Sequence, residues 1–292
     1  MRVRAVSRDA IRELVSAGWV DRTRAPVADG DTLWVPVRES EPCDREIPER
    51  KPYRGRGYHM VGDIAVLQGK EPTETEINEI AGFRHPRGIL WIESLQDITR
   101  IPRARVVWGI CGEVSHRESG ITYVLDPEKV MFSMGNRGEK ARLARLIRSS
   151  SRHERVADMF AGIGYFTLPL AAAGADVHAM EINPVAFGYL LRSIGANSLS
   201  GRITASLGDC RQALSGTYDR IVMGHFDAVS ALPDALRHAV PGSTIHIHSI
   251  GPAEDAIREL AEGAGFSATI HVHKVKKYRP HAWHVVQDVS LA

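Results

Sequence analysis

The alternation of apolar runs between residues 156 and 264 constrains the fold of this chain more than any other feature. Short runs rich in Val, Ile, Met and Phe alternate with longer segments whose apolar residues recur at helical spacing. Strands are expected over residues 156–160, 176–180, 203–207, 219–223 and 243–248, and helices over 166–173, 184–197, 230–239 and 254–264. This alternation predicts an α/β fold with a mostly parallel, doubly wound sheet, which the segments 268–275 and 284–289 close as an antiparallel pair.

The residues before 126 predict smaller regions. A helix is expected to begin at Ser7 and a strand to cover 32–37, before a linker over 38–57 that is rich in Pro, Gly and charge. Further strands are expected at 60–67 (bent at Gly62), 88–92 and 105–110, with a helix over 73–81. The predicted division is a small N-terminal α/β unit and linker at 1–50, a small mixed α/β domain at 51–125 and a ligand-binding domain at 126–292.

The composition is that of an ordinary globular protein and excludes several classes. Of the 292 residues, 43% are hydrophobic and 25% are charged, which excludes disorder over most of the chain. No two of the three cysteines form a CxxC pair, so neither a disulfide framework nor a structural zinc site is expected. His246 and His248 share one strand face but lack a visible third ligand, so no metal is predicted. No apolar run approaches the ~20 residues of a membrane span, and the charged N-terminus lacks a signal core, so we expect a cytoplasmic protein.

Charge is distributed unevenly although the net charge is only +2. Residues 137–152 hold six basic residues and one acidic residue, residues 274–279 hold four and none, and residues 84–105 hold five and two. Each run is compatible with a solvated helix face. Three such runs on one chain make an anionic polymer a second hypothesis for what these residues contact.

A glycine-rich turn carries the first functional signal. The sequence Asp158-Met-Phe-Ala-Gly-Ile-Gly follows an expected strand and opens an expected helix, where Gly162 and Gly164 allow close approach of a ligand to the backbone. Thr167 stands where a dinucleotide fingerprint has its third glycine, which argues against NAD. Glu181 ends the next strand and can accept both ribose hydroxyls, and Asp209 follows the third strand, where it can receive an adenine amino group. These features predict a nucleoside pocket for S-adenosylmethionine.

These residues resemble the class I methyltransferases, a Rossmann-like fold. More narrowly, the stretch DMFAGIGYFTLPLA and the upstream stretch VLDPEKVMFS (residues 124–133) are similar to one family. It contains the tRNA guanine-37 N1-methyltransferases and the wybutosine-synthesising aminocarboxypropyltransferases, including those of archaeal type. The resemblance runs from about residue 58 to the C-terminus and implies S-adenosylmethionine as co-substrate and tRNA as partner.

Two segments resemble the aminocarboxypropyltransferase branch. The methyltransferases carry an Asn-Leu-Pro-like motif after the fourth strand, whereas this chain reads DRIVMGH over residues 219–225. The run KVKKYRPHAWHVV at 274–286 is also similar to that branch. We expect an apolar, acid-free wall after the fourth strand, suited to an aromatic base whose ring carbon attacks. The resemblance implies transfer of the 3-amino-3-carboxypropyl group to 4-demethylwyosine at position 37 of phenylalanine tRNA, with release of methylthioadenosine.

The resemblance also implies roles for individual residues. The co-substrate would contact Ser133, Lys140, Phe160, Gly162, Gly164, Glu181, Asp209 and Cys210. Two of these depart from the family: Lys140 stands where an Arg is usual, and Cys210 where an Asn follows the Asp. The residues expected to contact the tRNA backbone are Lys274, Lys276, Lys277 and Arg279.

Several alternatives remain open. His225 is a candidate to contact substrate or accept a proton, against a packing or surface role. The competing functions are a tRNA guanine-37 N1-methyltransferase and a non-catalytic RNA-binding subunit with this fold. A monomer that binds the anticodon region of the tRNA is expected. The product formed from S-adenosylmethionine separates the three functions.

Overall fold

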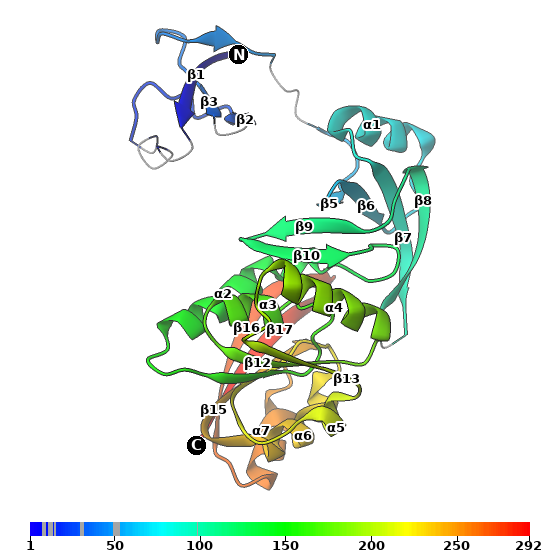
Figure 1. Ribbon diagram of the computed structural model, residues 1–292, viewed down its shortest axis with the longest axis vertical. Helices are drawn as coiled ribbons and strands as arrows, with labels where there is room; N and C mark the ends of the chain where they lie inside the picture. The colour runs from blue at the N-terminus through cyan, green and yellow to red at the C-terminus, as the bar shows by residue number, and fades with distance from the viewer. Residues whose placement is uncertain (8–9, 11–13, 15, 30–31, 49–52, 98) are drawn as a thin grey trace. The chain divides into compact units, whose positions relative to one another are not determined.

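The computed structural model describes the chain except for residues 8–9, 11–13, 15, 30–31, 49–52 and 98. It forms two compact units, Met1–Arg54 and Gly55–Ala292 (Figure 1). The finer division predicted at residues 50 and 125 stays a prediction. None of the helices among the described residues is both long enough and apolar enough to cross a membrane.

The first unit is built on an antiparallel sheet in the order β2-β3-β1-β4. Its strands are β1 (Arg2–Ser7), β2 (Val27–Asp29), β3 (Thr32–Pro36) and β4 (Arg45–Glu46). The strand expected at 32–37 is therefore present as β3. The helix expected to begin at Ser7 falls largely on residues outside those described, and Ser7 itself ends β1.

The second unit contains a seven-stranded sheet in the order β13-β12-β11-β14-β15-β17-β16. Its strands are β11 (Arg155–Asp158), β12 (Asp176–Glu181), β13 (Ile203–Leu207), β14 (Tyr218–Met223), β15 (Ala239–Ile250), β16 (Ala268–Arg279) and β17 (Ala282–Leu291). The first five pair in parallel, and β17 runs antiparallel to both β15 and β16. The predicted doubly wound sheet with an antiparallel last strand is confirmed. Because β11 lies in the middle, the chain reverses its winding there, and ligands bind at such a switch point.

Helices cover both faces of this sheet. One apolar core joins it to α2 (Arg137–Ser149), α3 (Thr167–Ala172) and α4 (Pro184–Ala196). The other core joins it to α6 (Leu232–Arg237) and α7 (Glu254–Gly263). Three shorter helical elements also belong to this part of the chain: α5 (Cys210–Ala213) and the 3-10 turns Met134–Asn136 and Ala228–Ala231.

A smaller mixed sheet precedes it in the order β5-β6-β7-β8. Its elements are β5 (His59–Val61), β6 (Ile64–Gln68), α1 (Glu74–Arg84), β7 (Gly88–Gln96) and β8 (Ile101–Gly109). The helix expected over 73–81 is present as α1, which begins with a capping box in which Thr73 and Glu76 bond each other's backbone. The single bent strand expected at 60–67 is wrong: Gly62 adopts φ 59°, and the chain turns back there into a hairpin.

A hairpin of β9 (Val114–Glu118) and β10 (Ile121–Leu125) packs on α4. The Ser193 hydroxyl accepts the Val124 N–H at 2.9 Å, and the Asn197 side chain bonds both the N–H and the carbonyl of Thr122, at 2.9 and 2.7 Å. This hairpin is therefore fixed to the large sheet's helical layer.

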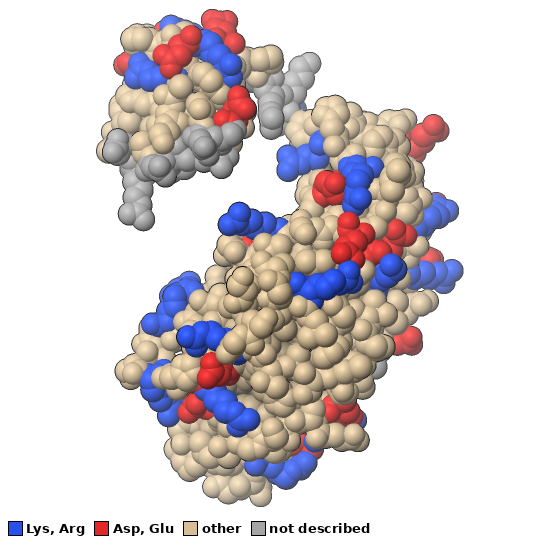
Figure 2. All heavy atoms as spheres, in the orientation of Figure 1, with Lys and Arg blue, Asp and Glu red and all other residues tan. Residues whose placement is uncertain are grey.

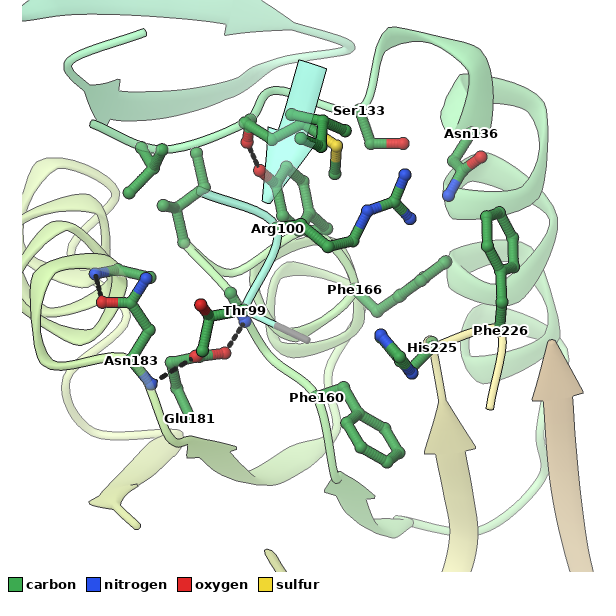
Figure 3. A pocket seen from close by; sticks show the side chains of 18 of the residues that line it. Thr99, Arg100, Ser133, Asn136, Phe160, Phe166, Glu181, Asn183, His225 and Phe226 are labelled. Atoms are coloured by element: carbon green, nitrogen blue, oxygen red, sulfur yellow. Dashed lines mark hydrogen bonds between the residues drawn. The ribbon is translucent and has the colours of Figure 1, made fainter. Parts of the chain in front are cut away.

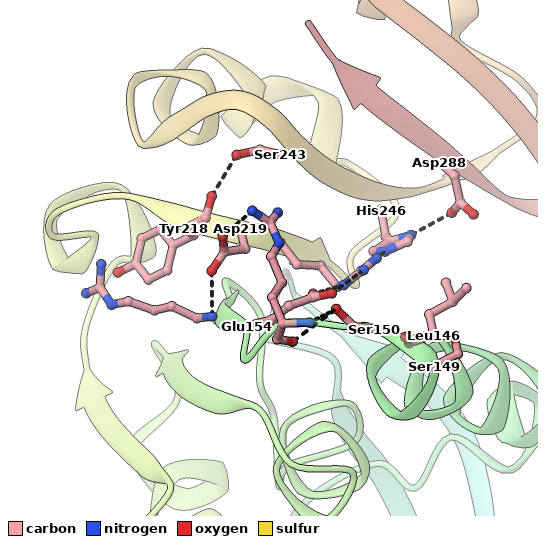
Figure 4. A network of polar contacts seen from close by, with 12 residues as sticks. Leu146, Ser149, Ser150, Glu154, Tyr218, Asp219, Ser243, His246 and Asp288 are labelled. Carbon is pink, nitrogen blue, oxygen red and sulfur yellow. Dashed lines mark hydrogen bonds and ion pairs between the residues drawn. The ribbon is translucent and has the colours of Figure 1, made fainter.

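A chain of largely buried polar groups connects β17 to β14, β15 and α2, and Figure 4 shows the contact between His246 and Asp288 within it. Arg142 forms a bidentate pair with Asp288, at 2.6 and 2.9 Å, and a second pair with Glu139. His246 Nδ1 lies 2.6 Å from Asp288 Oδ1, one of the two oxygens that Arg142 contacts, and its Nε2 lies 2.6 Å from Arg220. Because Arg220 can only donate, His246 Nε2 accepts and Nδ1 carries the proton.

Candidate functional site

A cavity of about 780 Å³ opens at the carboxyl ends of β11, β12, β13 and β14 (Figure 3). Four strand ends contribute residues 159–160, 162–163, 181–183, 208–211 and 224–227. Residues 130–137, the loop residues Thr99 and Arg100, Glu118 of the next hairpin and two residues of β16 are among the others that line it. The cavity therefore lies at the carboxyl ends of the strands, where the sequence predicts a nucleoside pocket.

The glycine turn shapes the floor of this cavity. Gly162 has φ 57° and Gly164 has φ 98°, in the left-handed region that favours glycine. A Cβ on Gly162 would lie 2.6 Å from the Tyr165 ring. Gly162 lines the cavity, whereas Gly164 lies behind it, where a Cβ would meet Leu168 and Leu190.

Glu181 sits directly against this turn. Its carboxylate accepts the Gly162 N–H and the Asn183 N–H, each at 2.7 Å. Burial raises the pKa of Glu181 above its ordinary value, and these hydrogen bonds oppose that effect. The carboxylate lines the cavity at the point where the sequence expected ribose recognition.

Thr167 has a structural purpose that the sequence did not reveal. The Asp158 Oδ2 accepts both the Thr167 N–H at 3.0 Å and the Thr167 hydroxyl at 2.6 Å. Both side chains are fully buried, so this pair ties the end of β11 to the start of α3. Burial raises the pKa of Asp158 to about 6, against the hydrogen bonds from Thr167.

The third strand end supplies Asp209 and Cys210. Asp209 caps α5 by accepting the Arg211 N–H at 3.0 Å, and its carboxylate also pairs with the Arg211 guanidinium. That pairing lowers the pKa of Asp209. Burial raises the pKa of the Cys210 thiol to about 11, so it remains protonated at neutral pH. Asp209, Cys210 and Phe160 all line the cavity.

The structure separates Ser133 from Lys140. Ser133 lines the cavity, whereas Lys140 does not and is only 3% exposed. The Lys140 Nζ lies 2.5 Å from Oε1 of Glu118, which does line the cavity. The expected direct contact of Lys140 with the co-substrate stays a prediction, because Lys140 is paired with Glu118 and does not line the cavity.

The wall after β14 is largely aromatic. The ring centroids of Phe160 and His225 lie 5.5 Å apart, and the Arg100 guanidinium carbon lies 5.1 Å from the centroid of Phe226 (Figure 3). The expectation of an acid-free wall is wrong, because Asp227 also lines the cavity. Its side chain is 82% exposed, so the carboxylate faces solvent rather than the buried part of the wall.

The expected tRNA-contacting residues divide into two groups. Lys274, Lys277 and Arg279 are exposed on the edge strand β16, and Lys274 Nζ lies 5.2 Å from the centroid of the Trp283 ring. Lys276 instead lines the cavity, packed against Gly135, and burial lowers its pKa.

About half of the basic residues in the other two runs are paired with carboxylates. Pairs join Arg87 to Asp63, Arg103 to Glu93, Arg105 to Glu71, Arg142 to Glu139 and Asp288, and Arg152 to Asp219. Figure 2 shows Lys and Arg interspersed with Asp and Glu on the visible face of the larger unit. Lys274, Lys277 and Arg279 form no ion pair with the part of the chain that the structure describes.

Sequence reasoning missed Glu118, Asn136, Thr99 and Arg100 as cavity residues. Glu118 ends a strand of alternating polarity that was not recognised, and Ser119-Gly120 behind it is the turn signal that could have found it. Both ring nitrogens of His246 have hydrogen-bond partners, Asp288 and Arg220. His248 Nδ1 lies 2.8 Å from His284 Nε2. Within the described residues no cluster suited to a metal ion is found.

The fold and this cavity are those of class I, Rossmann-like S-adenosylmethionine-dependent transferases, with the cavity at the switch point of the sheet. Residues 114–275 match the model of the TRM5/TYW2 methyltransferase domain. The chain belongs to this family.

Individual relatives extend over most of the chain. A protein of Methanocaldococcus jannaschii named tRNA(Phe) (4-demethylwyosine(37)-C(7)) aminocarboxypropyltransferase is 33% identical over 249 residues, which are 81% of this chain and 98% of that protein. Pyrococcus horikoshii TYW2, solved in complex with MeSAdo, has a TM-score of 0.70 and 28% identity over 81% of this chain and 91% of that one. Trm5b of Pyrococcus abyssi has a TM-score of 0.74 and 25% identity over 99% of both chains.

Proposed function

We propose that this protein transfers the 3-amino-3-carboxypropyl group of S-adenosylmethionine to 4-demethylwyosine at position 37 of phenylalanine tRNA, releasing methylthioadenosine. The observation that carries the proposal is the wall after β14. It presents Gly224, His225 and Phe226 to the cavity where the methyltransferase branch has an Asn-Leu-Pro-like motif. The M. jannaschii relative bears the name of this activity.

The cavity residues fit the co-substrate. Glu181, held by two N–H groups, would bind the ribose hydroxyls, while Asp209 and Cys210 would face the adenine. Phe160 and Gly162 would line the nucleoside, with Gly164 shaping the turn, and Ser133 lies toward the methionine part. When bound, S-adenosylmethionine supplies a carbon activated by its sulfonium. This chain's residues hold that carbon in line with the incoming base.

The attack of the base on the activated carbon needs little acid–base catalysis; a proton is lost only at the end of the reaction. The new carbon–carbon bond uses an electron pair of the base ring, and the carbon–sulfur bond breaks with its pair on a neutral thioether. The ring carbon then loses its proton to restore aromaticity. The Nδ1 of His225 accepts the Asp227 N–H at 3.2 Å, so Nε2 of the neutral ring carries the proton and can only donate. His225, with its side chain 17% exposed beside Phe160, would therefore contact the base, and solvent at the open rim would accept the proton from the ring carbon.

The partner is tRNA, bound through its anticodon region. We propose that Lys274, Lys277 and Arg279 contact backbone phosphates and that Lys276 acts inside the cavity. Residues 126–292 would be the catalytic domain of a cytoplasmic monomer, with 51–125 and 1–50 as accessory domains.

A second function is favoured by one observation. The similarity to the methyltransferase Trm5b covers 99% of this chain, including its first unit, whereas that to P. horikoshii TYW2 covers 81%. A guanine-37 N1-methyltransferase is therefore the alternative to test.

The test uses S-adenosylmethionine labelled either in the methyl group or in the carboxyl carbon. Each is incubated with phenylalanine tRNA that carries either 4-demethylwyosine or guanine at position 37. Carboxyl label in the first tRNA alone supports the proposal. Methyl label in the guanine tRNA supports the alternative, and no label in either tRNA indicates a binding protein.

A further inference from the structure

Glu118 is an anionic side chain at the cavity wall whose second oxygen is unsatisfied. It ends β9, and Ser119 and Gly120, with φ of 52° and 86°, form the tight turn that fixes it opposite Ile121. Its side chain is 5% exposed. The Oε1 atom pairs with Lys140 at 2.5 Å, whereas Oε2 is buried without a hydrogen-bond partner among the described residues.

Burying a carboxylate oxygen without a hydrogen-bond donor costs free energy. Because Glu118 lines a ligand cavity, a bound ligand can supply the missing donor. The same end of the cavity holds Asn136, whose Oδ1 is also buried without a partner in the described part of the chain. An Arg137–Ser119 hydrogen bond joins the two neighbouring segments. Two acceptors, one of them charged, match a group that only donates and is cationic. An ammonium is such a group.

Lys140 is placed to hold the carboxylate rather than to bind ligand. Its Nζ lies 5.1 Å from the ring centroids of Tyr123 and Phe132 and 5.9 Å from that of Tyr165. The rings enclose it and keep it out of the cavity lining. The cationic side chains that do line this end are Arg100, Arg137 and Lys276, and Figure 3 shows Arg100 near Ser133 and Asn136. Donors for a carboxylate and acceptors for an ammonium therefore meet in one place.

We propose that Glu118 binds the α-ammonium of the aminocarboxypropyl arm, with Lys140 as the positioning residue that orients its carboxylate. This rests on the proposed function, because it takes S-adenosylmethionine as the ligand. Fixing the arm at its far end limits which carbon of the sulfonium can face the base. Glu118 thereby becomes a determinant of which group is transferred.

The test is calorimetric binding of three ligands: S-adenosylhomocysteine, its analogue without the amino group, and methylthioadenosine, which lacks the arm. The wild-type protein should bind S-adenosylhomocysteine about 10- to 100-fold more tightly than the desamino analogue, the range for a hydrogen bond to a charged group. Glu118→Gln should abolish this preference and leave methylthioadenosine affinity unchanged. The matched control, Glu113→Gln, changes an exposed carboxylate paired with Arg192 and should keep the preference.

Glu118→Gln leaves the Lys140 charge buried and can unfold the protein. The double variant Glu118→Gln with Lys140→Gln replaces the ion pair by a neutral one, and the same loss of preference is expected. Retention of the preference in either folded variant overturns the proposal. So does equal affinity of the wild-type protein for the first two ligands, which needs no variant. The proposed function fails separately, when the wild-type protein shows the preference but puts no carboxyl label into tRNA.

Discussion

The Glu181 carboxylate accepts the Gly162 N–H at 2.7 Å and so joins the end of β12 to the turn after β11. The second oxygen accepts the Asn183 N–H at the same distance, just before α4 begins. Both oxygens are therefore preset by the backbone, and the carboxylate faces the cavity without having to reorganise.

Glu181→Gln is expected to weaken methylthioadenosine binding about 10- to 100-fold. An amide has one acceptor oxygen, so its NH₂ group would face one of the two N–H donors. Titration calorimetry measures the effect. Asp176→Asn, at the other end of the same strand and 57% exposed, is the control and should bind as the wild-type protein does. Unchanged affinity in Glu181→Gln would place the ribose elsewhere.

Asp158 predicts a specific dependence of stability on pH. Burial raises its pKa to about 6 in the folded protein, above its ordinary value of 3.8. Between these values the folded state holds more protons than the unfolded state, so this group's contribution to the unfolding free energy falls as pH rises from about 4 to 6. The full fall is about 3 kcal/mol.

The measurement is denaturant unfolding of the wild-type protein and Asp158→Asn across this range. The amide keeps an acceptor for Thr167 but has no charge to bury. As pH rises, the unfolding free energy of the variant should therefore increase by about 3 kcal/mol relative to that of the wild-type protein. A difference that stays constant with pH contradicts the raised pKa.

The Arg142–Asp288–His246 group predicts a large effect on stability without one on ligand binding. Asp288→Asn removes a charge that Arg142 and His246 both contact, and the folded protein should lose roughly 3–5 kcal/mol. Glu93→Gln breaks an exposed pair with Arg103 and should cost less than about 1 kcal/mol. Equal losses for the two variants would mean that the buried group does not hold β17.

The exposed cations of β16 predict the salt dependence of tRNA binding. The triple variant Lys274→Ala, Lys277→Ala and Arg279→Ala should weaken binding and reduce the slope of log K against log salt by about one for each lost phosphate contact. Filter binding at several salt concentrations measures this slope. Arg202→Ala, whose partner is Asp176, should leave it unchanged. A triple variant with the wild-type slope would remove β16 from the RNA interface.

Local sequence signals predicted the large sheet and the strand ends that line the cavity. The strand–turn–helix pattern around Gly162 and the acid at the end of the next strand are both local, so the sequence contained them directly. Helix α2 was missed because its Lys and Arg residues were taken as a charge run. Leu143, Ala144 and Ile147, buried at helical spacing, were the signal for it.

The end of the cavity that holds Glu118 could not be predicted in the same way. It joins Glu118 of β9, Asn136 before α2 and Arg100 from the loop after β7, which are separated in the chain and meet only through tertiary packing. The resemblance to the family placed Lys140 at this end. Its burial behind Glu118 depends on the rings of Tyr123, Phe132 and Tyr165, which no local pattern brings together.

The nucleoside released during turnover tests the central claim most directly. Purified protein, S-adenosylmethionine and phenylalanine tRNA bearing 4-demethylwyosine are incubated together, and the small molecules are separated by chromatography. Transfer of the aminocarboxypropyl group should release methylthioadenosine in an amount equal to the tRNA modified. S-adenosylhomocysteine in that amount, with no methylthioadenosine, would contradict it.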